Sequence, residues 1–118
     1  MLPALQPLCD RIARRLGFVP NNCLLNRYLD GESSMGFHSD SSQELADGSG
    51  VAIVSLGAER SIIFRAKADR ALEFRYPLPA GGLLYMPQEI QSTWLHAIPK
   101  MPGAGERISL TFRAIVAA

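Results

Sequence analysis

The sequence contains only two cysteines, two histidines and one tryptophan in 118 residues, and its charges nearly cancel. Cys9 and Cys23 lack the C-x-x-C spacing of zinc and redox sites, so we expect both thiols to be reduced and free of metal. No apolar run reaches the ~18 residues that a transmembrane helix needs, and the N-terminus lacks the basic and apolar regions of a secretion signal. We therefore expect a cytoplasmic protein that does not enter a membrane.

Charge and composition exclude two further classes of protein. The net charge of +1 excludes a strongly cationic nucleic-acid clamp, although it leaves room for a local basic patch. The hydrophobic share of 47% and the charged share of 19% are those of a folded globular protein, not of a disordered chain. The length suits one domain over residues 1–118, and no repeat or linker divides it. The oligomeric state stays open.

One helical segment opens the chain. Between residues 4 and 16, apolar side chains recur at spacings of three and four, at Leu5, Leu8, Ile12 and Leu16. Gly17 is a suitable residue to end the helix, because glycine readily adopts the left-handed conformation found after helix C-termini. The spacing therefore predicts an amphipathic helix over 4–16.

The rest of the chain has the shorter period of β-strands. Its segments are short, apolar or alternating, and rich in β-branched and aromatic residues; they cover 23–29, 51–56, 61–65, 71–76, 82–86, 94–98 and 107–115. Turn-forming residues separate them. One helix followed by seven or eight strands predicts a mainly β fold, an antiparallel sandwich or jelly roll with the N-terminal helix packed outside.

The last of these strands has two different faces. Apolar and polar residues alternate along it, with Ile108, Leu110 and Phe112 on one side and Arg107, Ser109, Thr111 and Arg113 on the other. We expect the apolar side to pack on the N-terminal helix. The polar side could face solvent, but an early strand also places Asn26 and Tyr28 on one face. Such side chains together can hold a carboxylate in a mostly apolar cavity.

The two histidines lie where a metal site would need them. His38 and Asp40 are two residues apart, so on an extended segment both project to the same side, and His96 supplies a second imidazole. Two imidazoles and one carboxylate leave open positions on Fe(II), as in non-haem iron oxygenases, whereas structural zinc prefers four protein ligands. A nearby arginine could hold the far carboxylate of an oxoacid such as 2-oxoglutarate. Taken singly, His38 could also be a surface polar residue and His96 a hydrogen-bonded structural histidine.

Several segments, taken in order, resemble the AlkB-like oxygenases, the oxidative nucleic-acid dealkylases. They are N-R-Y-L-D-G at 26–31, S-M-G-F-H-S-D at 34–40, V-S-L-G-A-E-R at 54–60, G-L-L-Y-M at 82–86, H-A-I-P-K at 96–100 and R-I-S-L-T-F-R at 107–113. These segments span nearly the whole chain, and the final arginine motif is the most specific. The resemblance implies a double-stranded β-helix (jelly roll) that binds Fe(II) and uses 2-oxoglutarate and O2, with release of succinate and CO2.

The resemblance also implies roles for single residues. The implied iron ligands are His38, Asp40 and His96. The implied 2-oxoglutarate residues are Asn26, Tyr28, Arg107 and Arg113, with Ser109 where the family often has asparagine. Six residues of extended strand span about 20 Å, so Arg107 is the better partner for the distal carboxylate. Arg113 could instead form a salt bridge that closes the end of the barrel.

Departures from the family bear on the substrate. Ser41-Ser42-Gln43 follow Asp40, where AlkB-like enzymes commonly have acidic residues that help to hold a damaged base. Only a short segment precedes Asn26, so we expect the usual N-terminal lid over the nucleotide to be missing. Phe37 replaces a common tryptophan. A basic stretch around a predicted hairpin could grip phosphates or simply face solvent; it comprises Arg60, Arg65, Lys67, Arg70 and Arg75.

From the resemblance we expect oxidative N-demethylation of alkylated nucleobases in DNA or RNA. A possible nucleic-acid substrate is therefore the expected partner. Hydroxylation or demethylation of a protein side chain or a small molecule is one alternative. A non-catalytic jelly-roll module that only binds a metal is another.

Overall fold

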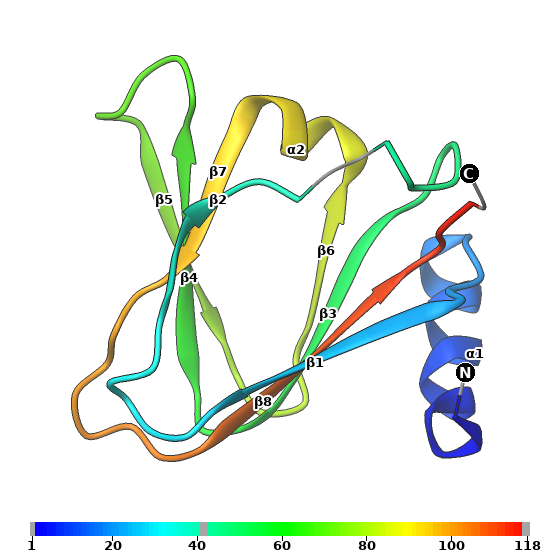
Figure 1. Cartoon of the computed structure of the whole chain (residues 1–118), viewed down its shortest axis with the longest axis horizontal. Helices are drawn as coiled ribbons and strands as arrows, with labels where there is room; N and C mark the ends of the chain where they lie inside the picture. Colours follow the sequence, from blue (N-terminus) through cyan, green and yellow to red (C-terminus); the bar gives the residue numbers. More distant parts are fainter. Residues whose placement is uncertain (1, 41–42, 117–118) are drawn as a thin grey trace.

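The computed structural model describes residues 2–40 and 43–116, and within them the chain forms two four-stranded antiparallel sheets (Figure 1). One sheet has the order β1-β8-β3-β6 and the other the order β2-β7-β4-β5. The elements are η1 (Pro3–Leu5), α1 (Gln6–Leu16), β1 (Asn22–Tyr28), β2 (Met35–His38), β3 (Gly50–Gly57), β4 (Arg60–Ala66), β5 (Glu73–Leu78), β6 (Leu83–Pro87), α2 (Gln88–Thr93), β7 (Trp94–Ile98) and β8 (Arg107–Arg113). This interleaved strand order is that of a jelly roll and confirms the predicted fold class.

Helix α1 packs on the outer face of the first sheet. Its Cys9 and Ile12 are buried in one cluster with Leu110 and Phe112 of β8, as the alternation of that strand predicts. Gly17 ends the helix with a φ of 78°, and its N–H donates to the carbonyl of Ala13 at 3.1 Å. In the described part of the chain, no helix has the length and apolar character that crossing a membrane would require.

The space between the two sheets contains both a core and a polar region. Val51, Ile62 and Met86 are fully buried in the apolar part. The polar face of β8 also turns inward, and Arg107, Ser109 and Thr111 are all buried. This face of β8 is therefore not the solvent-facing side that the sequence left open, and its buried polar groups require hydrogen-bond partners inside the fold.

The observed elements differ from the expected ones in two short elements and at several boundaries. Strand β2, of four residues, was not among the expected strands, although His38 was placed on an extended segment. Helix α2 was not predicted, because six residues are too few to display a helical period. Strand β5 begins two residues later than expected and continues to Leu78. The regular part of β8 ends at Arg113, after which Ile115 forms only an isolated bridge to Leu45. These differences concern short elements and element boundaries, which depend on contacts with residues distant in the sequence.

Gly31 joins two loops that close one end of the barrel. Its carbonyl accepts a hydrogen bond from the N–H of Met101 at 2.8 Å, and a Cβ added at Gly31 would lie 1.8 Å from the carbonyl oxygen of Met101. Gly31→Ala must therefore push the loops apart, and we expect it to lower the free energy of unfolding by about 2 kcal/mol. Gly36→Ala is the control, because a Cβ at Gly36 meets nothing within 4 Å. Urea denaturation measures both, and equal midpoints would contradict the close contact.

Candidate metal centre

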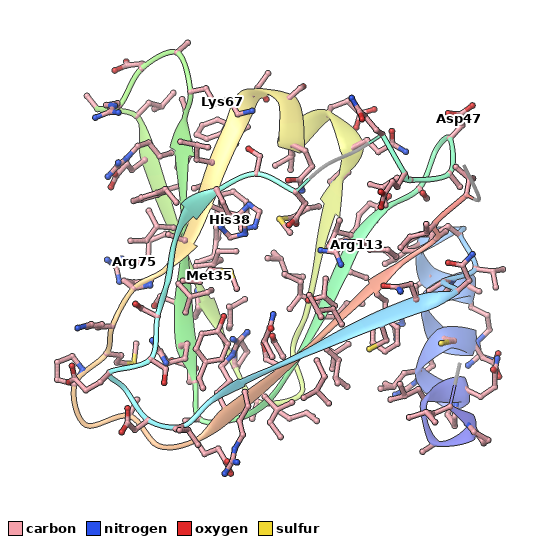
Figure 2. All side chains as sticks on the ribbon, viewed as in Figure 1. Met35, His38, Asp47, Lys67, Arg75 and Arg113 are labelled. Atoms are coloured by element: carbon pink, nitrogen blue, oxygen red, sulfur yellow. The ribbon has the colours of Figure 1, made fainter. Side chains whose placement is uncertain are left out.

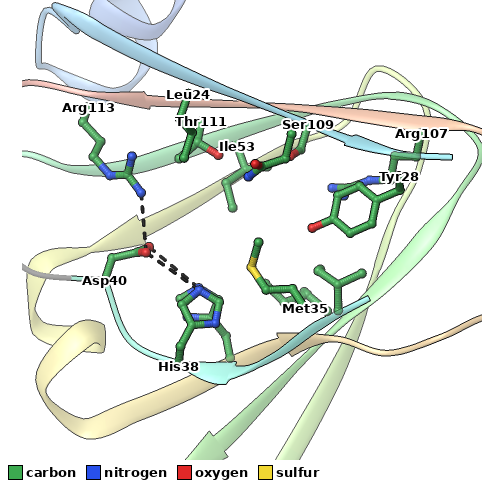
Figure 3. A pocket seen from close by; sticks show the side chains of 14 residues that line it. Leu24, Tyr28, Met35, His38, Asp40, Ile53, Arg107, Ser109, Thr111 and Arg113 are labelled. Carbon is green, nitrogen blue, oxygen red and sulfur yellow. Dashed lines mark ion pairs between the residues drawn. The ribbon is translucent and has the colours of Figure 1, made fainter. Parts of the chain in front are cut away.

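Strands β2 and β7 bring the two histidines together. His38 pairs directly with His96 in the antiparallel register, and the two ring centroids are 4.3 Å apart. Asp40 follows β2, and its carboxylate lies 3.8 Å from Nε2 of His38 and 3.7 Å from Nε2 of His96. One ligand atom from each of the three residues lies within 4.8 Å of the others. The three residues singled out from the sequence therefore meet at one point, and all three line a cavity between the sheets. Figure 3 shows His38 and Asp40 at one end of this cavity.

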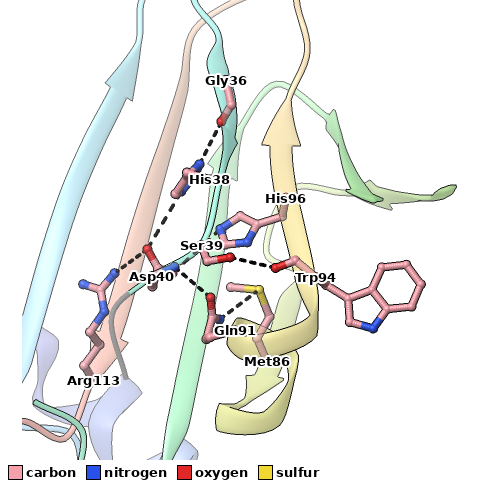
Figure 4. Close-up of polar contacts among 9 residues, drawn as sticks. All are labelled: Gly36, His38, Ser39, Asp40, Met86, Gln91, Trp94, His96 and Arg113. Atoms are coloured by element: carbon pink, nitrogen blue, oxygen red, sulfur yellow. Dashed lines mark hydrogen bonds and ion pairs between the residues drawn. The ribbon is translucent and has the colours of Figure 1, made fainter. Parts of the chain in front are cut away.

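Hydrogen bonds hold this group in place (Figure 4). Nδ1 of His38 lies 2.8 Å from the carbonyl oxygen of Gly36, so it donates its proton there and leaves the Nε2 lone pair free. The backbone N–H of Asp40 donates to Oε1 of Gln91 at 2.8 Å. The hydroxyl of Ser39 donates to the carbonyl of Trp94 at 2.8 Å, which ties the segment after β2 to the start of β7. Such contacts fix the tautomer and orientation of metal ligands.

His96 is the most buried member of the group, with 4% of its surface exposed. Burial, and to a lesser extent the neighbouring His38, lower the pKa of His96 to about 4, although Asp40 partly opposes the shift. The imidazole is therefore neutral near pH 7. A neutral imidazole is the form that coordinates a metal ion.

Arg113 lies at the metal end of the cavity. Its guanidinium is 3.5 Å from Oδ1 of Asp40, and both side chains are mostly buried, with 17% and 18% exposed. This contact holds the Asp40 side chain at the metal end of the cavity. Arg113 thus forms a salt bridge, the alternative role that the sequence left open, and its partner is Asp40. Arg113 and Arg107 lie at opposite ends of β8 (Figure 3).

Arg107 lies at the opposite end of the same cavity and is 1% exposed. Its guanidinium carbon is 4.9 Å from the centre of the Tyr28 ring, and one nitrogen donates to the hydroxyl of Ser55 at 3.0 Å. Nε and one terminal nitrogen have no hydrogen-bond partner among the described residues. Burial lowers the pKa of Arg107, while Tyr28 raises it. A buried cation with unused donors is suited to bind an anion.

Two further predicted residues lie between these ends. Asn26 of β1 pairs in register with Ser109 of β8, and both line the cavity. Tyr28 pairs in the same way with Arg107. Apolar side chains complete the wall, and Figure 2 shows Met35 and His38 pointing into the space between the sheets. A row of polar groups thus runs from the histidines to the buried arginine.

The residues present fit an Fe(II) ion with a dicarboxylic oxoacid. Two imidazole nitrogens and one carboxylate form the facial set of donors that non-haem iron oxygenases use, with positions left for further ligands. The unpartnered donors of Arg107 lie in the same cavity, where a distal carboxylate would complete their hydrogen bonds.

Some residues have a different role from the one that the sequence suggested. Arg60, placed with the basic stretch, is fully buried, so it neither grips phosphates nor faces solvent. Arg65 is paired with Glu73 at 2.6 Å, and Lys67 donates to the carbonyl of Gln91 at 2.9 Å. The role of Gln91 was missed, because an amide between two predicted strands carries no sequence signal. Ser41 and Ser42 lie outside the described residues.

Comparisons with known proteins agree with this geometry. The sequence matches the 2OG-Fe(II) oxygenase superfamily over residues 1–113. It is 37% identical to the DNA oxidative demethylase ALKBH2 of Homo sapiens, over 98% of this chain and 47% of that protein. The Bos taurus ALKBH2 is 38% identical, over 98% of this chain and 44% of that protein. The chain thus spans about half the length of these curated relatives.

The same fold occurs in a solved structure. A structure titled "The structure of OsALKBH1" superposes with a TM-score of 0.64 at 20% identity, covering 93% of this chain and 60% of that one. Together, the sequence matches and this superposition confirm the AlkB-like resemblance and the jelly-roll fold.

Proposed function

The chain belongs to the 2OG-Fe(II) oxygenase superfamily, and from this premise we propose that residues 1–118 act as one Fe(II)- and 2-oxoglutarate-dependent dioxygenase domain. One observation carries the proposal: a cavity with His38, Asp40 and His96 at one end and the unpartnered, buried Arg107 at the other. The two ends match the two demands of such an enzyme, a metal with open positions and a cation for a distal carboxylate.

In this proposal His38, Asp40 and His96 hold Fe(II). When bound, Fe(II) with 2-oxoglutarate and O2 supplies hydroxylation of a C–H bond, coupled to decarboxylation of the oxoacid to succinate and CO2. The protein contributes orientation and exclusion of water. Gln91 and the carbonyl of Gly36 orient the ligands.

Four other residues are proposed to hold the oxoacid. Arg107 forms the ion pair with its distal carboxylate through the nitrogen atoms that lack partners. Asn26, Tyr28 and Ser109 line the path between Arg107 and the metal end, where they can donate or accept hydrogen bonds. Arg113 contributes at the metal end, where its ion pair holds the carboxylate of Asp40 in place.

We propose an N-methylated nucleobase in DNA or RNA as the substrate. Hydroxylation of an N-methyl group gives an N-hydroxymethyl group, which breaks down to the free N–H and formaldehyde. The proposal is supported by the names of the relatives, which are DNA oxidative demethylases, and by similarity over 98% of this chain. The alternative substrates are a protein side chain or a small molecule.

The direct test supplies the purified chain with Fe(II), 2-oxoglutarate, O2 and single-stranded oligonucleotides that carry one N-methylated base. We expect succinate and formaldehyde in equal amounts, and neither product from the unmethylated oligonucleotide beyond background. Succinate without formaldehyde from any methylated base would reject the nucleobase and favour another substrate. If neither oxygen consumption nor succinate is detected, the result would indicate a jelly-roll module that binds a metal without catalysis.

A cytoplasmic location is a further proposal. Cys9 and Cys23 are both free thiols in the structure, and free thiols are typical of reducing compartments. Fractionation of cells that express the tagged chain tests the location, and recovery outside the cytoplasm would contradict it.

A further inference from the structure

Arg60, the first residue of β4, is a buried cation without a carboxylate partner. Its side chain is 0% exposed. It donates to the carbonyls of Ser33 at 2.7 Å and Pro99 at 2.6 Å, and more weakly to the carbonyl of Asp30 at 3.4 Å. Its Nε has no partner, and no ion pair within residues 2–40 and 43–116 includes it. Carbonyl oxygens, not carboxylates, are therefore the partners of this buried guanidinium.

Tyr28 connects this arginine to the proposed oxoacid site. The guanidinium carbon of Arg60 is 5.4 Å from the centre of the Tyr28 ring, and that of Arg107 is 4.9 Å from the same centre. Arg60 is close enough to Arg107 for its charge to oppose protonation of Arg107. Two positive charges are therefore buried around one phenol ring, at the end of the cavity away from the metal.

Burying two like charges together is unfavourable unless hydrogen bonds or negative charges offset their repulsion and their loss of hydration. The carbonyl oxygens around Arg60 supply partial negative charge, and the face of the Tyr28 ring adds a smaller amount. Among the described residues, neither Arg60 nor Arg107 forms an ion pair with a carboxylate. An anion that binds beside Arg107 would supply a full negative charge, so the two buried cations favour a negative group at this position.

We propose that Arg60 is a specificity-determining positioning residue: from behind Tyr28 it adds a second positive charge that makes the site select oxoacids with a distal carboxylate. The proposal rests on the proposed function, because it concerns the co-substrate of that site. Arg60 does not reach the cavity lining itself and acts through Tyr28 and Arg107. Two unit charges roughly 10 Å apart at an effective dielectric constant near 20 correspond to about a tenfold effect on binding of the anion.

A purely structural role is the competing explanation. The carbonyls that Arg60 holds belong to the loop after β1 and to the loop after β7, which also meet at Gly31 and Met101. If Arg60 only fastened these loops, its loss would weaken every ligand of the cavity alike. If its charge matters, its loss would weaken only ligands with a distal negative charge.

The experiment compares two acids that differ only in that carboxylate, 2-oxoglutarate and 2-oxovalerate. Their dissociation constants are measured by calorimetry without O2 on the full chain loaded with Mn(II), so the readout is binding and not turnover. For Arg60→Gln we expect the preference for 2-oxoglutarate to fall about tenfold, with binding of 2-oxovalerate changed less than about twofold. Arg60→Lys retains the charge and should retain most of the preference.

Arg75→Gln is the matched control, because it removes the same charge from an exposed position on β5. It should leave the preference unchanged. An unchanged preference in Arg60→Gln, or an equal loss of affinity for both acids, would overturn the role of Arg60 alone. A wild-type chain that does not prefer 2-oxoglutarate would overturn the proposed function, and the inference with it. If Arg60→Gln does not fold, the test rests on Arg60→Lys. A loss of the preference for 2-oxoglutarate in Arg60→Lys would overturn the inference, and a retained preference would support it.

Discussion

Asp40→Ala is expected to abolish 2-oxoglutarate turnover and to weaken binding of Fe(II) on the order of 100-fold or more, since loss of a ligand has a larger effect than loss of its supporting contacts. The carboxylate lies within 4 Å of both imidazole Nε2 atoms, so its removal takes away the only negative charge of the three-residue group. It also leaves the mostly buried Arg113 without its partner and places an uncompensated cation beside the metal position. Metal binding by calorimetry and succinate formation measure the two effects.

Asp47→Ala is the matched control for this experiment, because Asp47 is an exposed acid in the loop before β3 and lines no part of the cavity (Figure 2). It should bind metal and turn over as the wild type does. His38→Ala should behave like Asp40→Ala. Unchanged turnover in either ligand variant would reject the metal assignment, whatever the substrate.

Arg107→Ala is expected to raise the KM for 2-oxoglutarate on the order of 100-fold, whereas Ser109→Ala should raise it only about fivefold. The difference follows from charge, since Arg107 is a buried cation with two unpartnered nitrogen atoms and Ser109 offers one neutral hydroxyl. Steady-state rates of succinate formation at varied 2-oxoglutarate provide both values. The affinity for Fe(II) should change little in either variant, because Arg107 lies at the end of the cavity away from the histidines.

The control for Arg107 is Arg27→Ala on the neighbouring strand β1. Its side chain is 60% exposed and pairs with Glu106 on the outside of the barrel. An exposed ion pair of this kind contributes little, so the KM should stay within about twofold. Similar KM values for Arg107→Ala and Ser109→Ala would mean that the distal carboxylate binds elsewhere.

Part of the site could be predicted because strand geometry is local. The period of two along residues 107–113 separates an apolar side from a polar one, and the spacing of His38 and Asp40 places both on one side of an extended segment. Helix α1 follows from its apolar spacing in the same way, and its contacts with Leu110 and Phe112 are the expected ones. Each of these predictions needs only the residues within one element.

Other parts could not be predicted, because they depend on residues distant in the sequence. Arg60 belongs to a run of basic residues that looks like a solvated hairpin, and only the loops around Ser33 and Pro99 reveal that it is buried. Arg113 has the same residue type and the same strand face as Arg107, yet Asp40 meets one and not the other. The sequence contains no signal for the burial of Arg60, and for Arg113 it left a salt bridge open without naming Asp40 as the partner.

The amino-acid sequence by itself determined the fold class, the side of each strand that carries polar groups, and which histidines and acid could share a metal, because these properties depend on backbone periodicity over a few residues. The tertiary structure alone decided which groups face one another: His38 opposite His96, Arg113 on Asp40, and Arg60 behind Tyr28. The physical reason is that strand periodicity sets the direction of a side chain, whereas its partner comes from the pairing of strands and the packing of loops far apart along the chain.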